Sequence, residues 1–267
     1  DVENIKQTLS ASPISEFWDK VIQIRESDGY FMDYLSDFII EKKKKNPELL
    51  LDEKLLFISK KSYLIISRIL SHISEIENHL YFSDKYFNHL LKLTHFITEL
   101  EFDESQETLY TSLENIRRSS LLYLIKAFTP GRTEVSENQL TQVYTIIHFY
   151  LGLSSQKEYE SFTKMSPLGI ISVIHNDIKS TALRLVIEIG RWESAKLSSA
   201  ELTGGGRKCS NKIFKVIDGC LTEKNESVLL HAVCGLMLPT LYHLDPEYVK
   251  ETIEIIFPKN NLEILIP

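Results

Sequence analysis

Residues 177–192 have the sequence DIKSTALRLVIEIGRW, and this stretch decides the fold class. Its apolar residues Ile178, Ala182, Leu185 and Ile189 fall at i, i+4, i+7 and i+11, the spacing that places side chains on one face of an α-helix. Asp177 is a residue type that caps a helix N-terminus by accepting a hydrogen bond from a backbone N–H. The stretch therefore predicts an amphipathic helix that begins directly after Asp177.

The same helical period continues on both sides of this stretch. Ser136, with Gln139 three residues later, forms a capping box that begins one helix. Asp245 followed by Pro246 begins another, because proline is tolerated in the first turn of a helix. Ten glycines and eight prolines are few for 267 residues, which argues against an all-β protein. The predicted fold class is all-α, with helices over 28–45, about 53–80, 84–100, a segment ending at 129, 136–151, 168–175, 177–192, 210–221, 226–241 and 246–257, and a strand-like pattern only at 262–266.

The stretch from Asn176 to Val186 resembles the signature of the second helix in HEAT and armadillo repeats. In that signature an Asn or Asp caps the helix, a basic residue follows, and a small residue, here Ala182, lets neighbouring helices approach closely. Similar patterns occur at 114–121 and at 225–232, where Ala232 lies 50 positions after Ala182. Such repeats are ~40–47 residues long, and a glycine-containing insertion accounts for the excess. The resemblance implies a right-handed α-solenoid of HEAT/armadillo-like repeats, with residues 1–267 as a single helical-repeat domain.

The overall composition is that of a globular protein, with 43% hydrophobic and 25% charged residues. The net charge of −7 disfavours a protein that mainly coats nucleic acid. Three cysteines are an odd number for a chain of this length and indicate a reducing compartment, so we expect an intracellular protein of the cytoplasm or nucleus. The chain begins at Asp1 without an initiator methionine, so we also expect a fragment or a processed product.

Residues 198–208 form a polar segment that contains the run Gly204-Gly205-Gly206. We interpret the segment as a flexible loop, either natural or an engineered glycine linker. It is therefore left out of the search for functional residues.

The motifs of the common enzyme classes are not found in the sequence. The chain has no glycine-rich nucleotide loop, no Gly-x-Ser-x-Gly, no Cys-x-x-Cys and no His-Glu-x-x-His. In the most histidine-rich region, His72 and His79 are seven residues apart, and His89 and His95 are six apart. Metal ligands on one helix normally lie three or four residues apart. We therefore expect no catalysis, no metal and no cofactor.

A basic region lies between residues 42 and 61. It holds seven basic and three acidic residues, a local charge of +4 in a protein of net charge −7. One interpretation is a solvated helix end, because cations complement the negative C-terminal end of a helix dipole. The other is a patch that binds nucleic acid or phosphoinositide. The candidate patch residues are Lys42, Lys43, Lys44, Lys45, Lys60 and Lys61.

The candidate binding surface is the outer face of the predicted helix 177–192. By periodicity Arg184, Glu188 and Arg191 lie opposite the apolar stripe, with Trp192 at its edge. Arginine and tryptophan are enriched at interface hot spots, and the repeat resemblance implies that second helices line the surface that binds partners. The favoured function is a non-catalytic scaffold or adaptor that binds a peptide or helical segment of another protein, as a subunit of a larger complex. The alternative is a helical domain that binds nucleic acid or phosphoinositide through residues 42–61.

Overall fold

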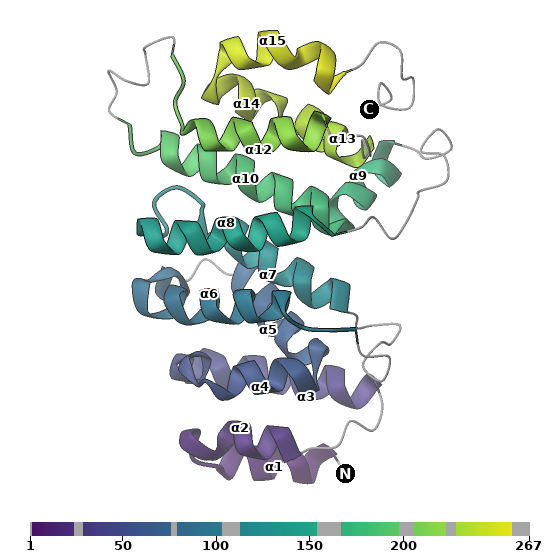
Figure 1. The fold of residues 1–267 in the computed structure, drawn as a ribbon. Coiled ribbons are helices and arrows are strands. Elements are labelled where there is room, and N and C mark those ends of the chain that lie inside the picture. Colours follow the sequence, from purple (N-terminus) through teal and green to yellow (C-terminus); the bar gives the residue numbers. More distant parts are fainter. Residues whose placement is uncertain are drawn as a thin grey trace. The chain divides into compact units, whose positions relative to one another are not determined.

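The fold is all-helical wherever the computed structural model describes the chain, which is residues 2–23, 29–75, 79–102, 113–153, 167–197, 206–222 and 228–257. These ranges contain fourteen α-helices, two 3₁₀ helices and no strand (Figure 1). The all-α prediction is confirmed for these residues. The right-handed solenoid stays a prediction, and the strand-like tail 262–266 lies outside the described residues.

Contacts between Cα atoms divide the chain into two compact units. Unit 1 comprises Asp1–Tyr123 and Thr133–Val143, and unit 2 comprises Leu124–Arg132 and Tyr144–Pro267. Helices α7 (Leu113–Ala127) and α8 (Glu137–Leu151) contribute residues to both units. The prediction of a single helical-repeat domain stays a prediction.

Unit 1 has a core rich in aromatic residues. Phe17 and Trp18 are fully buried, and the Trp18 indole N–H donates to the carbonyl of Leu49 at 2.9 Å, which satisfies the polar atom that burial would otherwise isolate. Helix α3 packs mainly against α5. The elements of this unit before α7 are α1 (Val2–Ala11), α2 (Ile14–Gln23), α3 (Gly29–Lys45), η1 (Pro47–Leu51), α4 (Lys54–Lys61), α5 (Tyr63–Glu75), η2 (His79–Phe82) and α6 (Asp84–Thr98).

Two of the predicted helices are in fact broken. The helix expected over 53–80 is interrupted at Ser62, which has extended backbone (φ −149°, ψ 101°) and ends α4 before α5 begins. The helix expected over 226–241 is interrupted at Met237, and Pro239 follows in the first turn of α14. Pro239 has no N–H to donate to the carbonyl four residues earlier, which accounts for the second break. The apolar period continues across both breaks.

The predicted helix starts are confirmed by their hydrogen bonds. The Asp177 carboxylate accepts from the Ser180 N–H at 2.7 Å. In the capping box, the Gln139 N–H donates to the Ser136 hydroxyl and the Ser136 N–H donates to the Gln139 side-chain oxygen. These signals are reliable because each involves residues only three positions apart.

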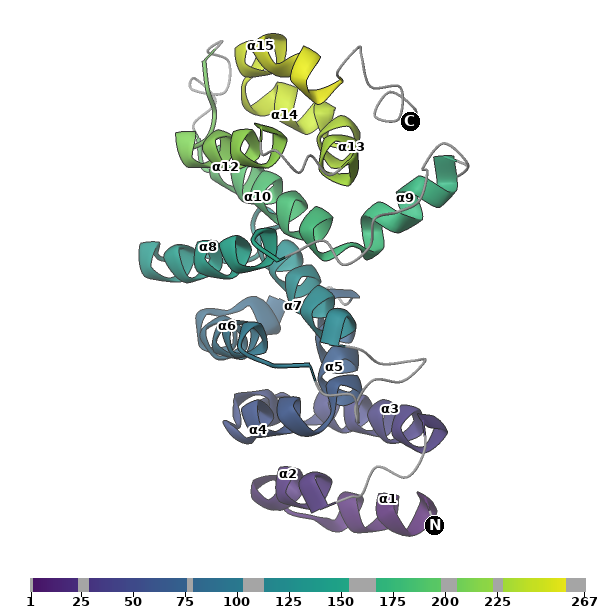
Figure 2. The ribbon, with the colours of Figure 1, turned by 45° about the vertical axis from the view of Figure 1, so that its right-hand side comes forward.

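Unit 2 is organised around α10. This helix packs against α9, α12, α13 and α14, and in Figure 2 α9 diverges steeply from α10 after a short turn. Ala182 is fully buried, and a Cβ added at Gly190 would lie 2.8 Å from Leu244 Cδ1, so α10 and α14 approach closely there. The helices of this unit after α8 are α9 (Pro167–Asn176), α10 (Ile178–Ser194), α12 (Asn211–Thr222), α13 (Val228–Leu236), α14 (Leu238–Leu244) and α15 (Pro246–Ile256).

Replacing Ala182 with leucine should lower the free energy of unfolding by about 1–3 kcal/mol, because a larger side chain overpacks a fully buried site. The sequence pattern predicts the same effect for Ala232→Leu, but Ala232 is only half-buried, so its effect should be smaller. Chemical denaturation of the two variants measures the difference. Equal destabilisation would support equivalent repeats instead.

Candidate functional site

Helix α10 is buried on most of its circumference. Thirteen of its seventeen residues are buried, including Leu183 and Ile187, which lie off the predicted stripe. Arg184 is half-buried, and the Arg191 side chain is 44% exposed. Arg184 and Arg191 therefore lie on the outer side of the helix, as predicted. That side is narrower than the exposed side of a helix that packs on one face alone.

Two of the residues expected on the outer face are buried instead. Trp192 is 5% exposed, and its ring meets Phe128 edge to face with centroids 5.2 Å apart. The Lys196 ammonium lies 3.2 Å from the centre of the indole. Glu188 is 7% exposed and pairs with Arg191 at 3.3 Å. The expected solvent exposure of Trp192 and Glu188 was wrong, because neighbours pack on more than one side of α10.

Helix α9 contributes exposed side chains that the sequence did not single out, among them Ile171 and His175. Ile171 is 37% exposed, and His175, one turn later, is also exposed. The His175 Nδ1 lies 3.5 Å from Arg184 Nη1. Partial burial and the Arg184 charge lower the pKa of His175, so this histidine is neutral at physiological pH. We name Ile171, His175, Arg184 and Arg191 the α9–α10 surface.

Periodicity could not have identified Ile171 as exposed. An isoleucine in an apolar helix is normally a core residue, and α9 has apolar residues on several faces. The sequence does contain one signal for this surface. Helix α9 connects to α10 through Asp177, which places the end of α9 beside the start of α10.

The basic region offers less free charge than its composition indicates. Lys43 is 1% exposed and lies in the core of unit 1, so its assignment to an exposed patch was wrong. Lys44 pairs with Glu41, and the Lys42 ammonium donates to the Ser10 carbonyl at 3.1 Å. Lys45 and Lys60 are exposed, the latter with its ammonium 5.1 Å from the centre of the Phe96 ring, and the side chain of Lys61 lies outside the described part.

The histidines of unit 1 have individual neighbours. The ring of His72 lies beside the Lys43 ammonium, and His95 is 4.0 Å from Glu99. His79, whose side chain lies outside the described part, is not placed. Within the described ranges no group of three or more His, Cys, Asp or Glu side chains could hold a metal ion.

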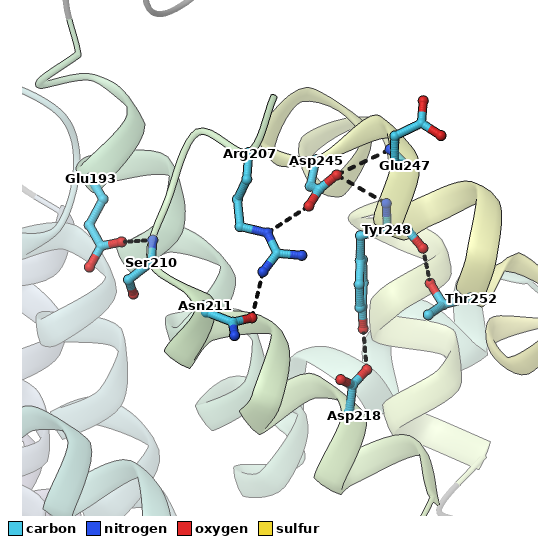
Figure 3. A network of polar contacts seen from close by, with 9 residues as sticks. All are labelled: Glu193, Arg207, Ser210, Asn211, Asp218, Asp245, Glu247, Tyr248 and Thr252. Atoms are coloured by element: carbon cyan, nitrogen blue, oxygen red, sulfur yellow. Dashed lines mark hydrogen bonds and ion pairs between the residues drawn. The ribbon is translucent and has the colours of Figure 1, made fainter. Parts of the chain in front are cut away.

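A polar network ties the start of α12 to α15 (Figure 3). The Arg207 guanidinium donates to Asp245 Oδ2 at 2.7 Å, and Asp245 Oδ1 accepts from the N–H groups of Glu247 and Tyr248. Burial raises the pKa of the Asp245 carboxyl, but the Tyr248 N–H and Arg207 outweigh burial and hold the pKa below its usual range. Asp245 therefore caps α15 and anchors the preceding chain at once.

The network extends along α12. The Tyr248 hydroxyl donates to Asp218 at 2.8 Å, and the Ser210 N–H donates to Glu193 at 2.7 Å (Figure 3). Sequence reasoning set aside 198–208 and so missed Arg207. Residues 198–205 lie outside the described part, whereas Arg207 is held by an ion pair and Lys208 donates its N–H to the Leu244 carbonyl at 2.8 Å.

The side chains of the basic region, the histidines of unit 1 and the network around Asp245 mostly contact other residues of this chain. The α9–α10 surface is therefore the candidate site. No described helix combines the length and apolar character needed to cross a membrane. Comparison of the chain with models of protein families, with curated proteins and with solved structures finds no match.

Proposed function

We propose that this protein is a non-catalytic interaction module whose α9–α10 surface binds an acidic segment of another protein. In the same proposal the helices form a right-handed solenoid of HEAT/armadillo-like repeats, and the protein acts in the cytoplasm or nucleus as part of a larger complex. The support comes from the repeat resemblance and from the presentation of two arginines on α10.

The observation that carries the proposal is the rigid mounting of Arg184 and Arg191. Helix α10 is packed by four neighbouring helices, so its backbone cannot shift without disturbing the core of unit 2. The two arginines are seven residues apart, which corresponds to about 10 Å along a helix. A rigid backbone reduces the entropy lost when a partner binds.

The chemistry of the surface favours a partner with carboxylates and an apolar residue. Guanidinium groups bind carboxylates through paired hydrogen bonds, and arginine is enriched at interfaces. Ile171 offers an apolar contact on the adjacent helix, and neutral His175 adds no competing charge. An acidic helix with carboxylates two turns apart would match both arginines.

Replacing both Arg184 and Arg191 with glutamine should weaken capture of the partner about tenfold or more, because two charged contacts are lost. Glutamine is preferable to glutamate at position 191, since a carboxylate there would face the nearly buried Glu188. The measurement is affinity capture from cell lysate with quantitative mass spectrometry of the captured proteins. Thermal denaturation tests whether the variant folds, because Arg191→Gln removes the charge that pairs with Glu188.

The matched control is Lys44→Gln with Lys45→Gln, which removes two positive charges from unit 1 and should leave capture unchanged. The opposite pattern, with loss in the lysine variant and a steep salt dependence, would favour nucleic acid or phosphoinositide binding. Unchanged capture in both variants would refute the α9–α10 surface as the binding site.

A further inference from the structure

Lys43 is a buried lysine without a carboxylate partner among the residues that the structure describes. It lies in the last turn of α3 and is 1% exposed. Its ammonium nitrogen is 3.1 Å from His72 Nδ1 on α5 and 4.9 Å from the centre of the Tyr81 ring in η2. The adjacent lysines of the same turn, Lys42 and Lys44, reach other partners outside this core.

In the described part of the chain, no negative charge acts on Lys43. On its own helix Lys44 is the charged group that bears on it, and Lys44 has the same sign. Glu41, which could have been a counter-ion, pairs with Lys44. Within the described part, the titratable groups that bear on this cluster are His72 on α5, Tyr81 in η2, and Glu41, whose charge acts on His72. Tyr86 on α6 acts in turn on Tyr81, and Glu48 in η1 acts on Tyr86.

An ammonium group in such a place is unfavourable because burial removes its hydration. The faces of aromatic rings compensate for only a small part of that loss. Burial and then the charge of Lys44 lower the pKa of Lys43 to about 7. Partial burial, then Lys43 and Lys44, lower the pKa of His72 to about 4, so His72 is neutral above that pH and its Nδ1 can accept a hydrogen bond from Lys43.

We propose that the Lys43–His72 pair is a pH-sensitive latch, which holds the last turn of α3 on α5 in alkaline solution and releases it as the solution is acidified toward neutrality. In the closed state Lys43 lies in the core as a neutral amine. In the open state the same side chain is hydrated and carries a proton.

The direction of the effect follows from proton binding. A hydrated lysine has a pKa of about 10.4, so between that pH and pH 7 the open state binds one more proton than the closed state. Each unit of acidification in this window therefore favours opening about tenfold. Below pH 7 the closed state also binds the proton at Lys43, and the Lys43 contribution becomes constant.

Amide hydrogen exchange of the full chain tests the latch. The opening constant for the backbone of residues 41–45, corrected for the intrinsic exchange rate, should rise about tenfold per unit as the pH falls from 9 to 7.5. Lys43→Met keeps a side chain of similar length and removes the amine. The opening constant of this variant should therefore not change with pH. Lys45→Met, in the same turn but exposed, should keep the pH dependence. A wild-type opening constant without pH dependence, or one that Lys43→Met leaves in place, would overturn the proposal.

NMR titration of the lysine ε-carbons provides a second measurement on the unmodified protein, which does not require a folded variant. One lysine signal should titrate well below the pKa of about 10.4 of a hydrated lysine, at or above the closed-state value of about 7. If every lysine titrates near 10.4, the latch is excluded.

Discussion

Replacing Trp192 with alanine should lower the free energy of unfolding by about 3–5 kcal/mol, because it removes a large buried ring and leaves a cavity. The ring is 5% exposed, packs edge to face on Phe128 and lies under the Lys196 ammonium. Chemical denaturation with fluorescence of the remaining tryptophan, Trp18, and circular dichroism measures the effect.

The control for this prediction is Arg184→Ala, a half-buried residue on the same helix, which should change the free energy of unfolding by about 0.5 kcal/mol or less. Trp192→Phe should lie between the two, because it keeps an aromatic contact with Phe128. If Trp192→Ala were as mild as Arg184→Ala, Trp192 would be exposed in solution, as the sequence alone predicts.

Replacing Asp245 with alanine should lower the free energy of unfolding by about 2–4 kcal/mol, because the change removes a helix cap and leaves the Arg207 ion pair broken. The carboxylate is 5% exposed and accepts three hydrogen bonds, from Arg207 and from the N–H groups of Glu247 and Tyr248. Glu247→Ala is the control, since the Glu247 side chain pairs with Lys250 at an exposed position, and its effect should be a few tenths of a kcal/mol.

The loss of stability caused by Asp245→Ala should also depend on pH. Its pKa is lower in the folded protein than in the unfolded chain, so its ionised form stabilises the fold. This stabilisation is present above the unfolded pKa and is lost as the pH falls through the folded pKa. The difference in stability between wild type and Asp245→Ala should therefore shrink in acid. A difference that stays constant from neutral pH to strong acid would contradict the role given to the carboxylate.

The helix starts could be predicted from the sequence because their causes are local. Asp177 and the Ser136–Gln139 pair act on N–H groups three residues away, and proline restricts its own turn. The breaks at Ser62 and Met237 were missed because the apolar period runs through them. That period reports which residues face the core, and a core can be lined by two short helices as well as by one long helix.

The environments of single charged and aromatic residues could not be predicted in the same way. Trp192 is buried against Phe128, 64 positions earlier in the chain, and Lys43 lies against His72 and Tyr81 on later elements. A run of four lysines looks solvated because charged residues are rarely buried. Only long-range packing decides which of the four points inward.

The close approach of α10 and α14 at Gly190 has an evolutionary consequence. A Cβ at position 190 would require the fully buried side chain of Leu244 to shift. A larger residue at position 190 should therefore be favoured together with a smaller one at position 244, so the two positions should covary in homologous chains. Such covariation would define a coupled pair of sites between helices separated by more than forty residues of sequence.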